Sequence, residues 1–154
     1  MPEVTLRMKD WIEVADDLLE YRKKSIFIKE IASRLVSDGI EIIPNDRKYL
    51  ETLPGVGRKT INVFLSVIYN EPAIAVDTHV ERVSKRLGLA FNSDNVLDVE
   101  NKLMKKISKD KWCKVHHQLV FFGRYKCKSR SPECMNCELK DICKYYKKIN
   151  SNSK

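Results

Sequence analysis

The sequence predicts an all-α protein, and three observations predict it. Apolar residues recur at helical spacing along most of the chain, as Ile28, Ile31, Ala32 and Leu35 do. Asn-Gly hairpin turns and regularly alternating apolar and polar runs are absent from the sequence. Gly, Pro, Asn and Asp gather between the periodic segments, where helices end and begin.

The first expected helix carries Ile28 to Leu35 and ends near Gly39, because glycine readily adopts the left-handed conformation that closes a helix. The next strongly apolar segment, 61–68, is apolar on most sides, as a central buried helix would be. A third helix runs through Val80 and Val83 and ends at Gly88 by the same argument.

A fourth helix is predicted from the stripe of Val96, Val99, Leu103 and Ile107, and the polar run 92–95 before it supplies candidate N-caps. Residues 1–18 keep an amphipathic character. After Tyr146 the chain becomes polar, so we expect a frayed tail, most clearly over 149–154.

Composition narrows the class of protein. The chain has 154 residues, 43% of them hydrophobic and 32% charged, which suits one globular domain or two small ones. No apolar run is long enough for a membrane span and no signal peptide is visible, so we expect no membrane partner and a cytoplasmic or otherwise reducing compartment. The net charge of +8 favours a polyanionic partner such as nucleic acid.

The most informative segment is 53–60, Leu-Pro-Gly-Val-Gly-Arg-Lys-Thr, directly before the apolar helix. A tight connection between two helices would explain Gly55 and Gly57 by itself. It explains Arg58 and Lys59 less well, because the positive end of the helix dipole disfavours cations there. A phosphate bound at the helix N-terminus would offset that repulsion, so the segment predicts binding to a DNA or RNA backbone.

Lys59 and Asp77 form a candidate catalytic pair. At a helix N-terminus, and partly covered by neighbours, the amine of Lys59 would favour its neutral, nucleophilic form. Asp77, in Val-Asp-Thr-His, could exchange protons with it, and could also serve as the N-cap of the helix that follows. A solvated lysine and a purely structural cap remain the simpler alternatives.

Four cysteines, Cys127, Cys134, Cys137 and Cys143, crowd into one segment with the spacing x6, x2 and x5. In a chain without a secretion signal such a cluster indicates a metal site more than disulfides. Four thiolates can hold zinc or an iron–sulfur cluster, and spacing alone leaves both open. Cys113 lies outside the pattern and is expected to be a buried thiol.

The adjacent His116 and His117 cannot easily share one ion, because neighbouring positions on a helix point about 100° apart. Packing in the core or at an interface is therefore the expected role of both histidines.

Taken together, these motifs resemble the endonuclease III family of DNA repair glycosylases, which belongs to the helix-hairpin-helix superfamily. The resemblance rests on 53–60, on Val-Asp-Thr-His, on His116-His117, on Gly-Arg-Tyr at 123–125 and on the cysteine spacing. It extends back to about Tyr21.

The resemblance implies a partial six-helix lobe over 1–76, with the helix-hairpin-helix at about 46–70. It also implies a second lobe over 77–148 that carries a [4Fe–4S] cluster in the loop 127–143. The four cysteines would be the cluster ligands, with zinc as the runner-up. Residues expected to contact DNA are Leu53, Gly55, Val56, Gly57, Arg58 and Thr60.

The implied activity is excision of oxidised pyrimidines from double-stranded DNA, followed by cleavage at the abasic site. A base would be flipped out of the duplex. Lys59 would then attack the sugar and form a Schiff base, β-elimination would break the strand, and Asp77 would assist.

Relative to that family the chain begins late and lacks the first helices of the six-helix lobe. We therefore expect an exposed apolar face on the helix 61–68, covered by a partner or a second copy. Two alternatives to an active enzyme are a non-catalytic DNA-binding iron–sulfur module and a fragment of a longer endonuclease III-like protein.

Overall fold

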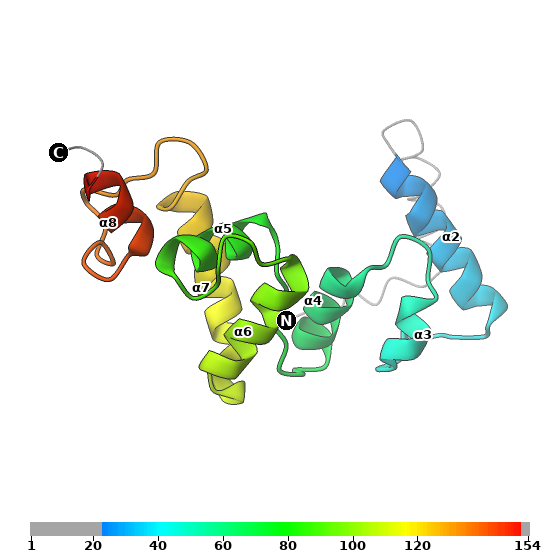
Figure 1. The fold of residues 1–154 in the computed structure, drawn as a ribbon. Coiled ribbons are helices and arrows are strands. Elements are labelled where there is room, and N and C mark those ends of the chain that lie inside the picture. Colours follow the sequence, from blue (N-terminus) through cyan, green and yellow to red (C-terminus); the bar gives the residue numbers. More distant parts are fainter. Residues whose placement is uncertain (1–22, 152–154) are drawn as a thin grey trace, which may run out of the picture. The chain divides into compact units, whose positions relative to one another are not determined.

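A computed structural model describes residues 23–151, and every regular element within them is helical (Figure 1). The all-α prediction is therefore confirmed for this part of the chain. The elements are α2 (Lys23–Ser37), α3 (Arg47–Glu51), α4 (Arg58–Ile68), α5 (Thr78–Leu87), α6 (Val96–Lys106), the 3-10 helix η1 (Lys109–Lys111), α7 (Trp112–Tyr125) and α8 (Lys144–Ser151). The amphipathic character expected of 1–18 lies outside the described residues.

The chain divides into two compact units, Met1–Ile61 and Asn62–Lys154. The division falls inside α4, whereas the sequence placed it after residue 76. A physical reason is visible at Asn62, whose buried side chain donates a hydrogen bond to the carbonyl oxygen of Ile74 at 3.0 Å. Most of α4 and the apolar run after it therefore belong to the second unit.

In the first unit, α2 buries Ala32 and Leu35 as its periodicity predicts. Gly39 follows its end with a φ of 68°, and the N–H of Gly39 donates to Val36 O at 3.1 Å. The predicted helix stop is thus confirmed. Asp38, beside it, accepts hydrogen bonds from Arg34 Nε at 2.9 Å and from the hydroxyl of Tyr49 at 2.8 Å, which fastens α3 to the end of α2.

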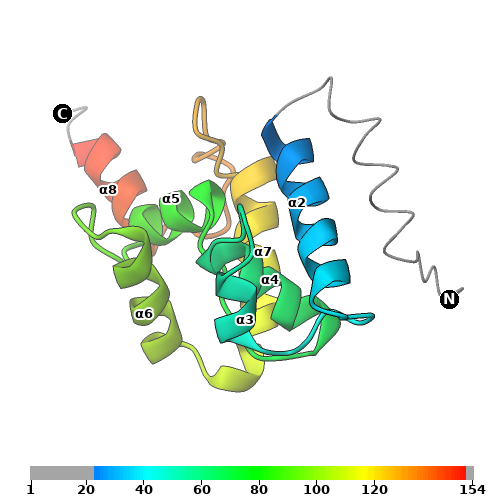
Figure 2. The same ribbon diagram turned by 90° about the vertical axis from the view of Figure 1, so that its right-hand side faces the viewer.

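The core of the second unit is formed where α5 packs against α7 and also meets α6 and α8 (Figure 2). Its buried side chains are Ile74, Val76, Val80, Val83, Ala90, Val99, Leu103 and Leu119. A close approach holds α5 against α7, because a Cβ atom added at Gly123 would lie 2.9 Å from the Cβ of His79. Only glycine fits there without a shift of the two helices.

Capping in the second unit follows the sequence closely. Gly88 ends α5 in the left-handed conformation with a φ of 86°. Asn95 caps α6 in a capping box with Asp98, so the polar run before that helix has the predicted role. The C-terminal end differs from the prediction, because α8 continues through Ser151 instead of fraying after Tyr146. Residues 152–154 lie outside the description.

One face of α4 is exposed, as the sequence predicts. Ile61 and Leu65 are fully buried, but Val63, Val67 and Ile68 are 37%, 57% and 59% exposed. The helix is therefore buried on one side only, and the other side presents branched apolar side chains to solvent.

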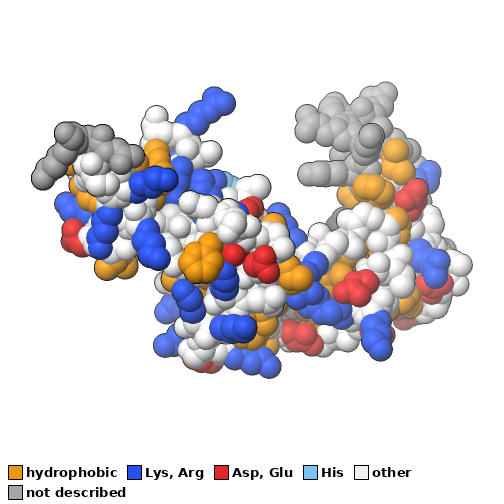
Figure 3. Space-filling model, viewed as in Figure 1, with side chains coloured by type: hydrophobic (Ala, Val, Ile, Leu, Met, Phe, Trp, Pro, Cys, Tyr) orange, Lys and Arg blue, Asp and Glu red, His pale blue; other side chains and the backbone are white. Residues whose placement is uncertain are grey.

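Basic side chains dominate the second unit's surface on the face that Figure 3 shows, over the region of α5, α6 and α8. Among the described residues, no helix has both the length and the apolar character needed to cross a lipid bilayer.

Candidate functional site

The first candidate site is the turn between α3 and α4. Asp46 caps α3 by accepting from the N–H groups of Lys48 at 2.9 Å and Tyr49 at 3.3 Å. The turn then closes with a hydrogen bond from Val56 N to Leu53 O at 3.2 Å, and the side chain of Leu53 is buried. The predicted hairpin is therefore two helices joined by a tight turn, anchored by Leu53.

The structure of the turn itself requires glycine at position 55. Its φ is +70°, a conformation that residues with a Cβ atom rarely adopt. A Cβ atom there would also lie 2.6 Å from the ring of Phe27 on α2 and 3.0 Å from the Cβ of Phe27. Because the near part of the Phe27 side chain is in the way, the clash cannot be relieved by a small ring rotation.

No such requirement applies to Gly57, because no atom of residues 23–151 beyond its chain neighbours lies within 4 Å of the place where its Cβ would be, and its φ is not positive. It directly precedes α4, whose first turn holds Arg58, Lys59 and Thr60 and no acidic residue. The N–H groups in a first turn have no acceptor within the helix, and they point at the space beyond its end. The open surface at Gly57 therefore suits an incoming anion.

Lys59 is exposed, as are Arg58 and Thr60 beside it. The sequence expected partial cover, and the difference arises because the buried side of this region is formed by Leu53 and Ile61 instead. The amine is directly accessible from solvent.

Asp77 begins the second unit's α5 and is half-buried. Its Oδ1 accepts from the N–H groups of His79 at 2.9 Å and Val80 at 2.7 Å, which confirms the predicted N-cap. Both bonds end on Oδ1, so the cap uses one of the two carboxylate oxygens. Lys59 lies in the first unit and Asp77 in the second.

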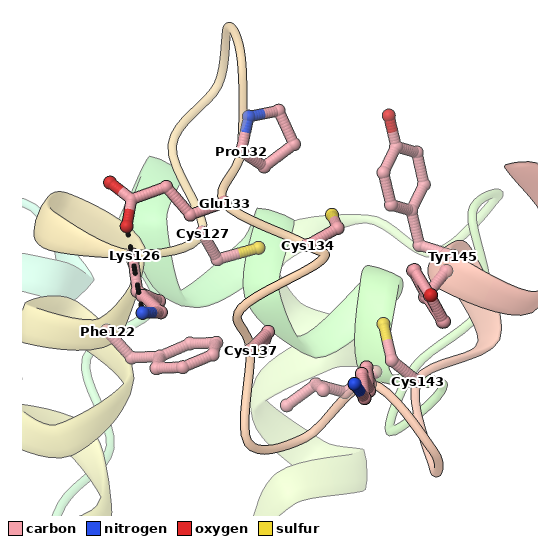
Figure 4. Close-up of a pocket in the computed structure, with 12 residues that line it drawn as sticks. Phe122, Lys126, Cys127, Pro132, Glu133, Cys134, Cys137, Cys143 and Tyr145 are labelled. Carbon is pink, nitrogen blue, oxygen red and sulfur yellow. Dashed lines mark ion pairs between the residues drawn. The ribbon is translucent and has the colours of Figure 1, made fainter.

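The second candidate site is the segment 127–143, the cysteine loop, between the end of α7 and the start of α8 (Figure 4). All four predicted cysteines line one cavity, and none of them forms a disulfide. Its other lining residues include Phe122, Pro132, Tyr145 and Tyr146. The structure therefore brings the predicted ligands together.

These sulfurs lie close enough for the charge on one to change the pKa of another. Burial, and then the neighbouring Cys127 and Cys143, raise the pKa of the Cys134 thiol. A cation bound among them would remove this mutual repulsion of the thiolates. In residues 23–151, however, no three His, Cys, Asp or Glu side chains are grouped closely enough to hold one metal ion. The sulfurs surround a cavity and do not converge on a single point.

Two arginines of α5 support the cysteine loop, and the sequence analysis missed both. Arg82 donates to Gly123 O at 2.7 Å and to Cys127 O at 3.1 Å. Arg86 donates to Lys128 O at 2.6 Å and to Ser129 O at 3.2 Å. Their spacing of one helical turn places both on one face of α5, which is the only signal that the sequence offered.

The three histidines contact neighbouring side chains and backbone groups of the protein. His79 Nδ1 lies 3.1 Å from Arg82 Nη2, so its described partner is Arg82. His116 and His117 pack edge to face, with ring centroids 5.1 Å apart. The Nδ1 of His117 lies 2.8 Å from the carbonyl oxygen of Cys113, whose side chain is half-buried where full burial was expected.

Known proteins resemble this chain over most of its length. A family model described as HhH-GPD superfamily base excision DNA repair protein matches residues 14–109, ending before the cysteine loop. Endonuclease III of Bacillus subtilis (strain 168) is 52% identical over 124 residues, which are 80% of this chain and 57% of that protein.

Solved structures of endonuclease III give the same result. A trapped endonuclease III–DNA covalent intermediate, an estranged-adenine complex, matches with a TM-score of 0.81 and 46% identity, covering 94% of this chain and 68% of the other. A non-covalent endonuclease III–DNA complex matches with a TM-score of 0.81 and 44% identity, covering 95% and 68%.

The chain thus spans somewhat more than half the length of the Bacillus relative, at 57%. The family match nevertheless covers most of the chain, including the hairpin turn, Lys59 and Asp77. It follows that the chain belongs to the HhH-GPD superfamily of base excision DNA repair proteins and, within it, to the endonuclease III family.

Proposed function

We propose that this protein is a DNA glycosylase with abasic-site lyase activity that removes oxidised pyrimidines from double-stranded DNA. The observation that carries the proposal is the exposed amine of Lys59, held in the first turn of α4 directly after the glycine turn. A nucleophile in that position lies next to the surface that suits a phosphate, so one duplex can occupy both.

The hairpin is the proposed DNA contact. Gly57 leaves the approach to the N-terminus of α4 open, and Arg58 and Thr60 flank it. Backbone N–H groups and cations at such an end bind phosphate oxygens whatever the base sequence. Leu53, Gly55 and Val56 shape the turn, and two structural relatives are endonuclease III–DNA complexes.

Lys59 is proposed to attack C1′ of the damaged nucleotide, so that the C1′–N bond to the base breaks and the base leaves with a proton. The amine and the opened sugar then form a Schiff base. Loss of a proton from C2′ expels the 3′ phosphate and breaks the strand. Asp77 would accept the proton of the attacking amine and stabilise positive charge on the sugar, using the oxygen that the helix cap does not occupy.

Cys127, Cys134, Cys137 and Cys143 are proposed to hold a [4Fe–4S] cluster. Four thiols are the donor set that such a cluster takes, one for each iron. A single zinc ion needs four donors within about 2.3 Å of one point, and the described side chains form no such group. Membership of the endonuclease III family, and not the arrangement of the sulfurs, favours the cluster over zinc. When bound, the cluster would cross-link the loop and keep its basic residues in place.

The exposed apolar face of α4 is proposed to be covered by a partner or a second copy of the chain, because branched apolar side chains in solvent favour association. Light scattering at rising concentration tests this, and a Val67→Lys variant should shift the protein toward the monomer. A wild type that is monomeric at every concentration contradicts it.

The enzymatic proposal is tested by trapping the Schiff base. The protein is incubated with duplex DNA that carries an abasic site, and borohydride is then added. A covalent protein–DNA adduct is expected for the wild type and for Lys48→Ala, a matched control on the exposed face of α3. Lys59→Ala should give none.

A second candidate function is a non-catalytic DNA-binding module. It is favoured by one observation: the hairpin turn is complete within a short stretch of chain and needs no pocket to bind phosphate. Salt-sensitive DNA binding by the wild type, without an adduct under the same conditions, would establish it and contradict the lyase.

A further inference from the structure

Arg86 lies on α5, far along the chain from the cysteine loop, yet its side chain reaches one of the four sulfurs. Its Nη1 donates to Cys127 Sγ at 3.4 Å. The same nitrogen donates to Lys128 O at 2.6 Å, and Nη2 donates to Ser129 O at 3.2 Å. The planar guanidinium group can make several such bonds at once because its five N–H donors have a fixed geometry.

Arg86 also contacts the other end of the loop. Its guanidinium carbon lies 4.5 Å from the centre of the Tyr145 ring, two residues after Cys143. The sulfur of Cys143 lies 3.4 Å from the backbone carbonyl oxygen of Arg86. One residue of α5 therefore touches both the first and the last of the four cysteines.

Neighbouring cations behave differently. Arg82, one turn earlier, donates to the carbonyl oxygens of Gly123 and Cys127. Lys126 and Lys128 face the carboxylate of Glu133, at 3.6 and 3.0 Å. These groups hold backbone or balance charge within the loop, whereas Arg86 donates to a sulfur.

We propose that Arg86 is a positioning residue of the four-cysteine site, which fixes the Cys127 sulfur and stabilises negative charge on it. The inference rests on the proposed metal site and extends it to a residue outside the cysteine motif. Hydrogen bonds and positive charge at cluster sulfurs raise the reduction potential of the cluster, and partners that orient a ligand slow the loss of metal.

The test compares Arg86→Gln, Arg86→Lys and the wild type, each as the full chain carrying its metal. The first measurement is the rate of iron release to a chelator, and the second is the midpoint potential of the cluster. We expect Arg86→Gln to release iron about tenfold faster, since a lost hydrogen bond to a charged group has an effect of that order. Its potential should also shift to more negative values.

Arg86→Lys separates charge from geometry. A lysine keeps the positive charge but cannot donate to the sulfur and two carbonyl oxygens together. Its potential should therefore stay near that of the wild type, while its iron is released faster. If Arg86→Gln does not fold, as judged by circular dichroism, this variant carries the test, and a wild-type release rate in it overturns the proposal.

Lys85→Gln is the matched control, because it removes a cation from the adjacent position of α5, where Lys85 pairs with Glu81 at 2.6 Å. It should change neither measurement. Equal release rates in Arg86→Gln and Lys85→Gln overturn the proposal. In Arg86→Gln, which loses the charge as well as the hydrogen bond, faster release without any change in potential also overturns it, since the contact with the sulfur would then have no electronic effect.

Failure of the cluster proposal is distinguishable from failure of this one. A wild type that contains zinc and no iron contradicts the cluster, and the same variants are then compared by zinc release to a coloured chelator. Faster zinc release from Arg86→Gln than from Lys85→Gln supports the positioning role, and equal rates overturn it.

Discussion

The hairpin turn and the cysteine loop are each shaped to face an anionic group, but they are supported in different ways. The hairpin is held by neighbours in sequence, such as the Asp46 cap on Lys48 and the bond from Val56 to Leu53. The cysteine loop is held by Arg82 and Arg86, whose partners lie 41 to 45 residues further along the chain.

This difference teaches that a short sequence motif describes one site almost completely and the other only in part. The hairpin motif contains the hydrogen bonds that close its turn, so spacing is enough to predict the turn, and only its packing on Phe27 and Asp38 comes from α2 and the residue after it. The cysteine motif contains the ligands but not the groups that hold them, which come from α5. Variants that remove local or distant supports can therefore test the comparison.

The largest effect is expected for Arg82→Met. It leaves the buried Gly123 carbonyl group and the Cys127 carbonyl group without their cationic donor, which should lower the free energy of unfolding by about 3 kcal/mol. Urea unfolding measures this. Arg34→Met, at an exposed arginine of the first unit, is the control and should have little effect. Equal effects of the two variants would contradict the dependence on distant support.

The next largest effect is expected for Gly55→Ala, which tests the hairpin turn. The left-handed φ and the contact with Phe27 should together lower the free energy of unfolding by about 2 kcal/mol. Gly57→Ala should leave stability unchanged but weaken DNA binding, because its Cβ atom meets only the approaching phosphate. Thermal unfolding and fluorescence anisotropy with a labelled duplex check the two effects. A stability loss in Gly57→Ala would show that its role is structural.

Two variants of Asp77 distinguish its role as a helix cap from its proposed role in proton transfer. Asp77→Ala removes the acceptor for His79 and Val80 and should lower the free energy of unfolding by about 1 kcal/mol. Asp77→Ser keeps a capping oxygen and should keep stability, yet both variants should lose most of the borohydride-trapped adduct. Full adduct formation in Asp77→Ser would show that Asp77 caps the helix and takes no part in the proton transfer.

The smallest effect is the pH dependence of the hairpin's attachment to α2. The hydrogen bond from Arg34, and then that from Tyr49, holds the pKa of Asp38 below its usual value of 3.8. Stability from this carboxylate is therefore present above pH 3.8 and is lost as the pH falls through the lower folded value.

Tyr49 sets the alkaline limit of the same contact. Burial and Asp38 raise the pKa of the Tyr49 hydroxyl above 10.0, so its contribution is present below that pH and is lost as the pH rises through the folded value. Melting temperatures across this range should show a shallow loss at both ends. Asp38→Asn should make the acid limb shallower, with the remainder coming from Asp94 and Glu133, whose pKa values are lowered by Lys102 and Lys128. An unchanged acid limb in that variant would contradict the assignment.

Sequence reasoning predicted the helices with caps most reliably, because their signals are local. Gly39, Gly88 and the run before Val96 all end or begin helices as expected. The four cysteines line one cavity, whereas their role as metal ligands stays a prediction. The continuation of α8 to Ser151 was missed, because polar composition alone suggested fraying.

Arg82 and Arg86 could not be predicted in the same way. Each looks like an ordinary cation on a helix, and its partners are mainly backbone carbonyl groups, which leave no trace in residue type. The need for glycine at 123 is hidden for a similar reason, since it depends on His79 of another helix. Contacts of this kind appear only when the packing of α5 on α7 is known.

The length of chain between Arg86 and Cys143, 57 residues, bears on the order in which the molecule assembles. Closing so long a loop costs more chain entropy than closing a turn of a few residues, so the hairpin should form early in refolding and the sulfur-lined cavity late. Metal added to unfolded chains would then meet scattered thiols. We therefore expect higher yields when iron and sulfide are supplied after the helices have formed.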